Sequence, residues 1–205
     1  MNFLAHLFLA HDTPESLIGN LAGDFVKGSL HDRFTPGIRA GIMAHRKIDA
    51  FTDAHPQVAA FRRVLIPEHG HYARVVADVF LDHFLACHFD EYAGETLESF
   101  IDRTHATLDA HLDELPERLR DVYPWMRDQQ WLIGYRDIAG IELTLARMSR
   151  RVARPVNLAS ATHHLVDSRA ELERRFRAFF PDVVLFASEI YPLPQSEGSG
   201  AHVRK

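Results

Sequence analysis

The sequence predicts an all-α protein with a single domain, and three observations lead to this fold class. Apolar residues recur at helical spacing along almost the whole 205-residue chain. Thr13-Pro14 and Thr35-Pro36 each place a capping threonine before a proline, a pattern typical of helix starts. No alternating run of β-branched residues bounded by Asn-Gly or Asp-Gly is present, so we expect no strands.

Each helix is predicted from its apolar spacing and from the prolines that bound it. No strong linker interrupts the helices, so residues 1–190 are expected to form one domain. After Tyr191 the composition changes to Pro, Gln, Ser, Glu and Gly, which predicts a flexible tail over residues 191–205. The expected helices cover residues 3–8, 14 to about 28, 36–55, 56–66, 72–89, 97–112, pieces framed by Pro116 and Pro124, 141–152 and 161–180, with a short helix after Pro181.

Composition excludes several classes of protein. Hydrophobic residues make up 46% of the chain and charged residues 25%, which is typical of a folded protein. Every apolar stretch is shorter than the ~20 residues that a membrane span needs, and the N-terminus lacks the basic leader of a signal peptide. The net charge of −5 argues against nucleic-acid binding, and the single cysteine, Cys87, favours a reducing, cytoplasmic location.

Charge is distributed unevenly along the chain. Residues 81–121 carry eleven acidic and three basic side chains, a local net charge of −8. Residues 141–180 carry eight arginines against four acidic side chains, a local net charge of +4. This asymmetry has two equally good explanations. The two segments could simply be solvated helix faces, or the basic segment could be a positive surface that docks an acidic partner.

Histidine is unusually frequent, with 14 of 205 residues, and several histidines accompany carboxylates at helical spacing. Residues four apart on a helix share a face, so such groups can converge on one ligand. A carboxylate inside an apolar helix needs a cation, a hydrogen-bond network or a raised pKa, and a metal ion would supply the cation. Three segments fit this description: Asn20 with Asp24, His45 with Asp49 and Asp53, and Asp78 with Asp82 and His83.

Imidazole and carboxylate together favour Mn²⁺, Fe or Zn²⁺ over a thiolate-bound metal. Such an ion can polarise a phosphoryl oxygen and activate water, which is the chemistry of phosphoester hydrolysis. No Gly-x-Ser-x-Gly elbow, Walker loop or dinucleotide-binding glycine pattern competes with this interpretation. A surface position or a buried ion pair remains the alternative for each single carboxylate.

Several motifs together resemble the bacterial acyl carrier protein phosphodiesterases, over roughly residues 1–190. That family is similar to the HD-type metal-dependent phosphohydrolases in its helical fold, so the resemblance implies an HD-like domain. The chain departs from the usual HD pattern, because its adjacent pair is Asp82-His83 in reversed order. The motifs are Met1-Asn2-Phe3-Leu4-Ala5-His6-Leu7, Gly19-Asn20-Leu21, Asp24-Phe25-Val26, His45-Arg46-Lys47-Ile48-Asp49 with Thr52-Asp53, Asp82-His83-Phe84-Leu85, Trp131-Leu132 and Tyr135-Arg136-Asp137.

The resemblance implies hydrolysis of holo-acyl carrier protein to apo-acyl carrier protein and 4′-phosphopantetheine. It also implies a divalent cation, most often manganese, with Mg²⁺ or Fe²⁺ as possible substitutes. We expect the metal ligands to be Asp24, His45, Asp82 and His83. Asp49 and Asp78 are expected to orient ligands or activate water. Asp24, His6 and Asn20 are further catalytic candidates, although His6 could equally be a core imidazole.

Candidate substrate-binding residues follow from the same resemblance and from the charge asymmetry. Arg46 could hold a phosphate oxygen or face solvent. Phe25, Trp131 and Tyr135 could line a channel for the pantetheine arm, although aromatic residues at this spacing are often plain core. Basic residues could guide the acidic carrier protein: Arg136, Arg147, Arg150 and Arg151.

Two other functions stay open at this point. One is an HD-type phosphohydrolase that acts on a free nucleotide or another small phosphoester, without a protein substrate. The other is a non-catalytic helical adaptor that binds an acidic protein and has no need for a divalent ion. Neither alternative involves a nucleic acid or a membrane as partner.

Overall fold

The computed structural model describes residues 1–30, 33–150 and 156–191, and these ranges are helical and contain no strand. The all-α prediction is therefore confirmed. Short 3₁₀ turns occur at η1 (Gly70–Tyr72), η2 (Leu112–Glu114) and η3 (Leu158–His163). The helices are α1 (Phe3–Phe8), α2 (Pro14–Ala22), α3 (Pro36–Ala54), α4 (Pro56–His69), α5 (Ala73–Cys87), α6 (Phe89–Ala93), α7 (Leu97–Ala110), α8 (Glu117–Asp128), α9 (Trp131–Gly134), α10 (Ile138–Ser149), α11 (His164–Asp167) and α12 (Arg169–Ile190).

The capping threonines start α2 and α3 where the sequence predicts. Thr13 Oγ1 accepts a hydrogen bond from the backbone N–H of Ser16, and Thr35 Oγ1 accepts one from Ile38, each at 3.3 Å. The end of α2 differs from the prediction, because the helix stops at Ala22 instead of continuing toward Gly28. A turn follows, and it carries two of the predicted site residues.

Prolines inside helices account for the other differences. Pro67, Pro124 and Pro181 lie within α4, α8 and α12, so the breaks predicted at these residues are wrong. A proline inside a helix costs about 3 kcal/mol. In α12 the fully buried Phe179 and Phe180 precede Pro181 and the buried Val183 follows it. Burial of these side chains at ~1.5–3 kcal/mol each exceeds the cost of the proline.

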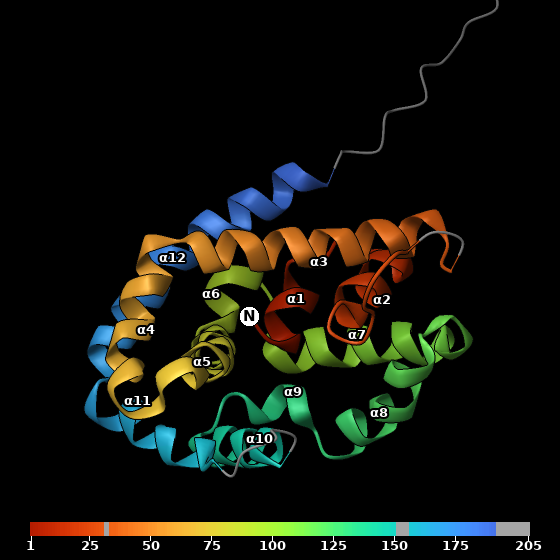
Figure 1. The fold of residues 1–205 in the computed structure, drawn as a ribbon. Coiled ribbons are helices and arrows are strands. Elements are labelled where there is room, and N and C mark those ends of the chain that lie inside the picture. Colours follow the sequence, from red (N-terminus) through yellow and green to blue (C-terminus); the bar gives the residue numbers. More distant parts are fainter. Residues whose placement is uncertain (31–32, 151–155, 192–205) are drawn as a thin grey trace, which may run out of the picture.

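Long-range packing brings the first part of the chain to the centre of the molecule. Figure 1 shows α1 in the middle, with the long helix α3 crossing above it, and α1 also packs on α2 and α5. α2 and α3 approach closely at Gly19 and Gly41, where a side chain on Gly19 would overlap the backbone of α3. α12 packs on both α3 and α4.

The buried apolar side chains from α1 to α12 form one continuous core. The expected boundary near residue 190 lies at the edge of the described residues, because residues 192–205 are outside them. In the part of the chain that the structure describes, no helix is long and apolar enough to cross a membrane.

Candidate metal centre

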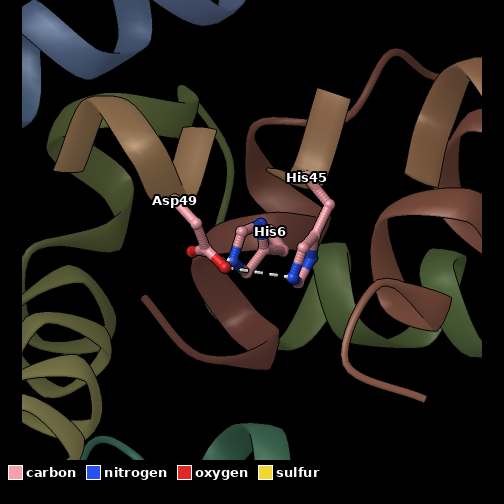
Figure 2. A group of neighbouring side chains, drawn as sticks. All are labelled: His6, His45 and Asp49. Atoms are coloured by element: carbon pink, nitrogen blue, oxygen red, sulfur yellow. Dashed lines mark hydrogen bonds and ion pairs between the residues drawn. The ribbon is translucent and has the colours of Figure 1, made fainter. Parts of the chain in front are cut away.

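Two helices bring together an imidazole–carboxylate group that we call the His–Asp cluster, made of His6, His45 and Asp49. His45 and Asp49 lie one turn apart on α3, and α1 places His6 against them (Figure 2). Asp49 Oδ1 lies 3.1 Å from His6 Nε2, and Asp49 Oδ2 lies 3.2 Å from His45 Nε2. The two imidazole rings stack with their centroids 3.7 Å apart. One potential ligand atom from each residue lies within 4.8 Å of the others.

The orientation of His45 is fixed from the α2 side. Its Nδ1 lies 2.8 Å from the carbonyl oxygen of Asn20, and because a carbonyl can only accept, Nδ1 carries a proton that it donates. Nε2 therefore faces the carboxylates of the site. Gly23 is required for this arrangement, since a side chain there would overlap the His45 ring. Asn20 thus acts through its backbone, while its side-chain amide donates to Ser16 O and to the Tyr191 hydroxyl.

Asp24 adjoins the His–Asp cluster on the side that faces solvent. Its Oδ1 lies 3.6 Å from His45 Nε2, and its side chain is 50% exposed. Burial raises the pKa of Asp24, but the neighbouring His45 outweighs this effect and lowers the pKa below its usual range. Asp49 behaves in the same way, because His45 and His6 together overcome the effect of burial and lower its pKa. Both carboxylates are therefore ionised at neutral pH.

The two histidines of the cluster respond in opposite ways. Burial lowers the pKa of His45, but Asp24 and Asp49 more than compensate and raise it to about 9. Burial, together with repulsion from His45, lowers the pKa of His6 to about 4. His6 is therefore neutral, and its buried Nδ1 has no hydrogen-bond partner among the described residues. The carboxylates of this site thus attract a cation, which His45 itself provides in the structure.

Asp78 lies beyond Asp49, across the amino group of Met1. That amino group is 3.4 Å from Asp49 Oδ1 and 3.2 Å from Asp78 Oδ1. Burial lowers the pKa of the amino group, but the charges of Asp78, Asp49 and Asp82 prevail and raise it to about 10. Arg62 contacts Asp78 at 3.8 Å and pairs with Asp53 at 2.6 Å. Asp78 therefore faces cationic protein groups, and it lies outside the His–Asp cluster.

Asp82, one of the predicted metal ligands, holds the start of α1. Its Oδ1 accepts from the backbone N–H of Asn2 at 3.0 Å, and its Oδ2 accepts from Leu4 at 2.8 Å and Ala5 at 3.4 Å. The side chain is fully buried. Burial raises the pKa of Asp82 to about 7, against the opposing effects of the Met1 amino group and of these hydrogen bonds. Both oxygens are occupied by the backbone of α1.

His83, the other predicted ligand on α5, faces Tyr135 and Arg169. Its Nδ1 donates to the carbonyl oxygen of Tyr135 at 2.8 Å, and its Nε2 lies 3.4 Å from an Arg169 guanidinium nitrogen. The side chains of adjacent helical residues point about 100° apart, so Asp82 and His83 contact different parts of the protein. Of the predicted metal shell, the structure brings Asp24 and His45 together and leaves Asp82 and His83 outside.

The donor atoms around Asp49 fit a divalent metal ion. Metal–ligand bonds of about 2.0–2.2 Å place neighbouring ligands roughly 3.0–3.4 Å apart. The contacts of 3.1, 3.2 and 3.6 Å that join His6, His45, Asp49 and Asp24 are close to this spacing. The hydrogen bond from His45 Nδ1 to Asn20 is also the arrangement that orients metal-binding histidines. His6 and Asp49, which the sequence suggested only as catalytic groups, belong to this donor set.

An aromatic wall, made of Phe3, Phe25 and Trp131, is linked to the site through the chain, because Phe25 directly follows Asp24 and Phe3 lies one turn before His6 on α1. Phe3 stacks on Phe25 with centroids 6.0 Å apart and on Trp131 at 6.4 Å. A small cavity of about 40 Å³ lies beside it, lined by Phe3, Trp131, Tyr135, Thr144, Arg147 and Met148. The sequence prediction missed Phe3, although its position three residues before His6 places both on one side of α1.

The predicted basic residues are spread over several surfaces. Arg46 donates to the carbonyl oxygens of Val26 and Gly28, so it holds the turn that follows Asp24. Arg136 forms a two-point ion pair with Glu98. Arg147 stacks over Trp131 at 5.1 Å from the ring centroid, and Arg150 is exposed at the end of α10. Arg151 lies outside the described residues.

Comparisons with known proteins agree on one family. A family profile described as acyl carrier protein phosphodiesterase matches residues 1–183. A protein of that name from Photorhabdus laumondii is 34% identical over 198 residues, which cover 95% of this chain and 100% of the relative. Relatives of the same name from Serratia proteamaculans and Escherichia coli O157:H7 are 35% and 36% identical, and the matches cover 92% of this chain and 98% of each relative.

No solved structure matches the chain. The family match extends over nearly all of the residues that build the core and includes every residue of the His–Asp cluster, the adjoining Asp24 and the aromatic wall. The chain belongs to the acyl carrier protein phosphodiesterase family.

Proposed function

We propose that this protein is a metal-dependent hydrolase that cleaves the phosphodiester of holo-acyl carrier protein and releases apo-acyl carrier protein and 4′-phosphopantetheine. The names of its relatives support this reaction. The observation that carries the mechanism is the convergence of His6, His45 and Asp49 beside the half-exposed Asp24. The single cysteine, Cys87, is in keeping with a reducing compartment, so we place the reaction in the cytoplasm.

In this proposal His45, Asp49 and His6 hold a divalent ion and Asp24 contributes from the open side. A mixed imidazole–carboxylate set can bind Mn²⁺, the ion that the family resemblance implies, with Mg²⁺ or Fe²⁺ as substitutes. When bound, the ion supplies charge stabilisation to the phosphoryl oxygens and a more acidic water. Asp24 is ionised and exposed, so its carboxylate can orient the attacking water and accept a proton from it.

The aromatic wall gives the thin pantetheine arm an apolar surface next to the scissile bond. Phe25 directly follows Asp24 in the turn after α2, so the wall begins beside the half-exposed carboxylate. Arg147 adds a positive group over Trp131, at the end of the wall remote from Phe25. The acidic carrier protein would dock on the side of α10, where Arg150 is exposed.

One assay tests the proposal directly. Purified protein is stripped of metal with EDTA, incubated with holo-carrier protein, and followed by mass spectrometry for loss of the phosphopantetheine mass. We expect no turnover without metal and recovery with Mn²⁺, better than with Ca²⁺, because Ca²⁺ prefers an all-oxygen site. Full activity in metal-free protein would reject the metal role. Binding of the carrier without cleavage would identify an adaptor, and cleavage of small phosphoesters alone would identify a different substrate class.

A further inference from the structure

A second group of metal-binding side chains lies where the end of α4 meets η3 and α11. Glu68 is in the last turn of α4, His163 ends η3, and His164 begins α11. Glu68 Oε1 lies 3.4 Å from His163 Nε2 and 3.7 Å from His164 Nε2. One potential ligand atom from each residue lies within 4.8 Å of the other two. None of these residues belongs to the candidate metal centre described above.

These separations are close to those between the ligands of a tetrahedral metal ion. Zn²⁺ bonds of about 2.0–2.2 Å to nitrogen and oxygen place neighbouring tetrahedral ligands about 3.4 Å apart. His163 is also oriented as a ligand, because its Nδ1 donates to the carbonyl oxygen of Ser160 at 2.7 Å. This hydrogen bond leaves Nε2 toward Glu68, which is the arrangement that supports metal-binding histidines in proteins.

His164 supplies an independent indication of a ligand. The residue is 6% exposed, and its Nε2 has no hydrogen-bond partner among the described residues. The 3.7 Å separation from Glu68 is too long for a hydrogen bond. A buried imidazole nitrogen without a partner is costly, and a metal ion between it and Glu68 would satisfy it. The ring of His69 meets that of His164 edge-on at 5.5 Å, so a further imidazole lies beside the group.

We infer that Glu68, His163 and His164 form a second divalent-metal site, which binds Zn²⁺ through two imidazole nitrogens and one carboxylate oxygen. Imidazole favours Zn²⁺ over Mn²⁺ in the general order of metal affinities. The side chains of Glu68 and His163 are 54% and 41% exposed, so the fourth coordination position faces solvent. The bound ion joins α4 to the segment that precedes α12, two parts of the chain about 95 residues apart in sequence.

The test uses the full-length protein and Zn²⁺ alone. Metal-free wild type and the double variant Glu68→Gln, His163→Gln are titrated with Zn²⁺ by calorimetry, and their thermal midpoints are measured with and without the ion. His71→Gln is the matched control, because His71 is exposed on η1 and packs on Tyr72, outside the group. We expect the double variant to bind one equivalent of Zn²⁺ fewer than wild type. It should also lose the rise in thermal midpoint that this equivalent of Zn²⁺ causes in wild type. His71→Gln should match wild type.

Equal stoichiometry in wild type and the double variant would overturn the inference, as would an equal loss in His71→Gln. Because the exposed Glu68 and His163 are the residues changed, the variant should keep its helical circular dichroism and its hydrolase activity with Mn²⁺. A parallel titration of His45→Gln separates this site from the candidate metal centre. If that centre also binds Zn²⁺, His45→Gln loses that equivalent and the double variant keeps it. If that centre binds no Zn²⁺, wild type binds one equivalent and the double variant none, so either result supports the second site independently of the proposed function.

Discussion

His45 is the residue on which the proposed metal centre depends most, because it can balance the charge of the site when no metal is bound. Its Nδ1 is committed to Asn20, and its Nε2 faces Asp24 and Asp49, whose charges raise its pKa to about 9. In the metal-free protein the protonated imidazole neutralises these carboxylates. A metal ion must displace that proton, because only the neutral imidazole is a ligand. In the proposed metal centre, metal and proton would therefore compete at this residue.

Asp49 offers a direct test, since the same helix carries a matched aspartate one turn later. Asp49→Asn removes a carboxylate that contacts both imidazoles, so we expect kcat/KM to fall by at least about 100-fold and metal affinity by a similar factor. Asp53 pairs instead with Arg62 and Arg74, and Asp53→Asn should change activity much less. Steady-state assays with Mn²⁺ and metal titrations check both variants. Equal losses would remove Asp49 from the donor set.

Gly23 makes a second prediction for the same imidazole. Gly23→Ala inserts a methyl group into the space that the His45 ring occupies, so the ring must rotate away from Asp24 and Asp49. We expect a loss of metal affinity and of turnover with little change in helical content. Gly134→Ala is the control, because the nearest atom to its added carbon lies at an ordinary 3.8 Å. Calorimetric metal titration compares the two variants, and unchanged affinity in Gly23→Ala would contradict the assigned position of His45.

At the scale of elements, the start of α1 depends on a side chain from α5. Asp82 accepts three backbone N–H groups from the first turn of α1, as a capping residue would, but from 77 to 80 positions away in the sequence. α1 is only six residues long and would not be stable alone. The position of His6 therefore depends on Asp82, although Asp82 touches no member of the His–Asp cluster in the contacts described above.

Burial of Asp82 predicts a pH dependence of stability. Its pKa is raised from 3.8 to about 7, so between these pH values the folded protein keeps a proton that the unfolded chain has released. The stability of the wild type should therefore decline as pH rises through this window, by at most about 4 kcal/mol. Asp82→Asn cannot titrate. We expect the thermal midpoint of wild type to exceed that of the variant by more at pH 5 than at pH 8, and a difference independent of pH would contradict this.

Helix starts were predictable from the sequence because their signals are local. Thr13 and Thr35 cap the next turn of their own chain, whatever the rest of the fold does. The continuation of α4, α8 and α12 through Pro67, Pro124 and Pro181 was not predictable, because burial of residues on both sides of each proline outweighs its cost, and burial is set by distant parts of the chain.

The same distinction applies to the candidate site. His45 and Asp49 share a helix face by their spacing alone, so the sequence indicates the pair. The partner of Asp82 could not be found this way, because a buried carboxylate in an apolar helix fits a metal ion and a backbone cap equally well. Likewise, nothing local shows that His83 faces Arg169 on α12.

At the scale of the whole molecule, the charge asymmetry remains a prediction about docking. If the arginines after α10 guide an acidic carrier protein, Arg150→Glu with Arg151→Glu should raise KM for the holo-carrier about two- to thirty-fold at low salt, with kcat nearly unchanged. The effect should shrink as salt rises. Arg63→Glu with Arg174→Glu changes the net charge equally on the exposed faces of α4 and α12 and is the control. Similar KM values for both double variants would assign the effect to net charge alone.

The packing of α12 has a consequence for the order in which the protein becomes active. α12 is the last described helix, yet it covers α3, which carries His45 and Asp49. A growing chain that still lacks α12 exposes that apolar face of α3 and cannot complete its core. The helix that carries His45 and Asp49 can therefore reach its packed form only after α12 has been synthesised, although α3 itself is made much earlier.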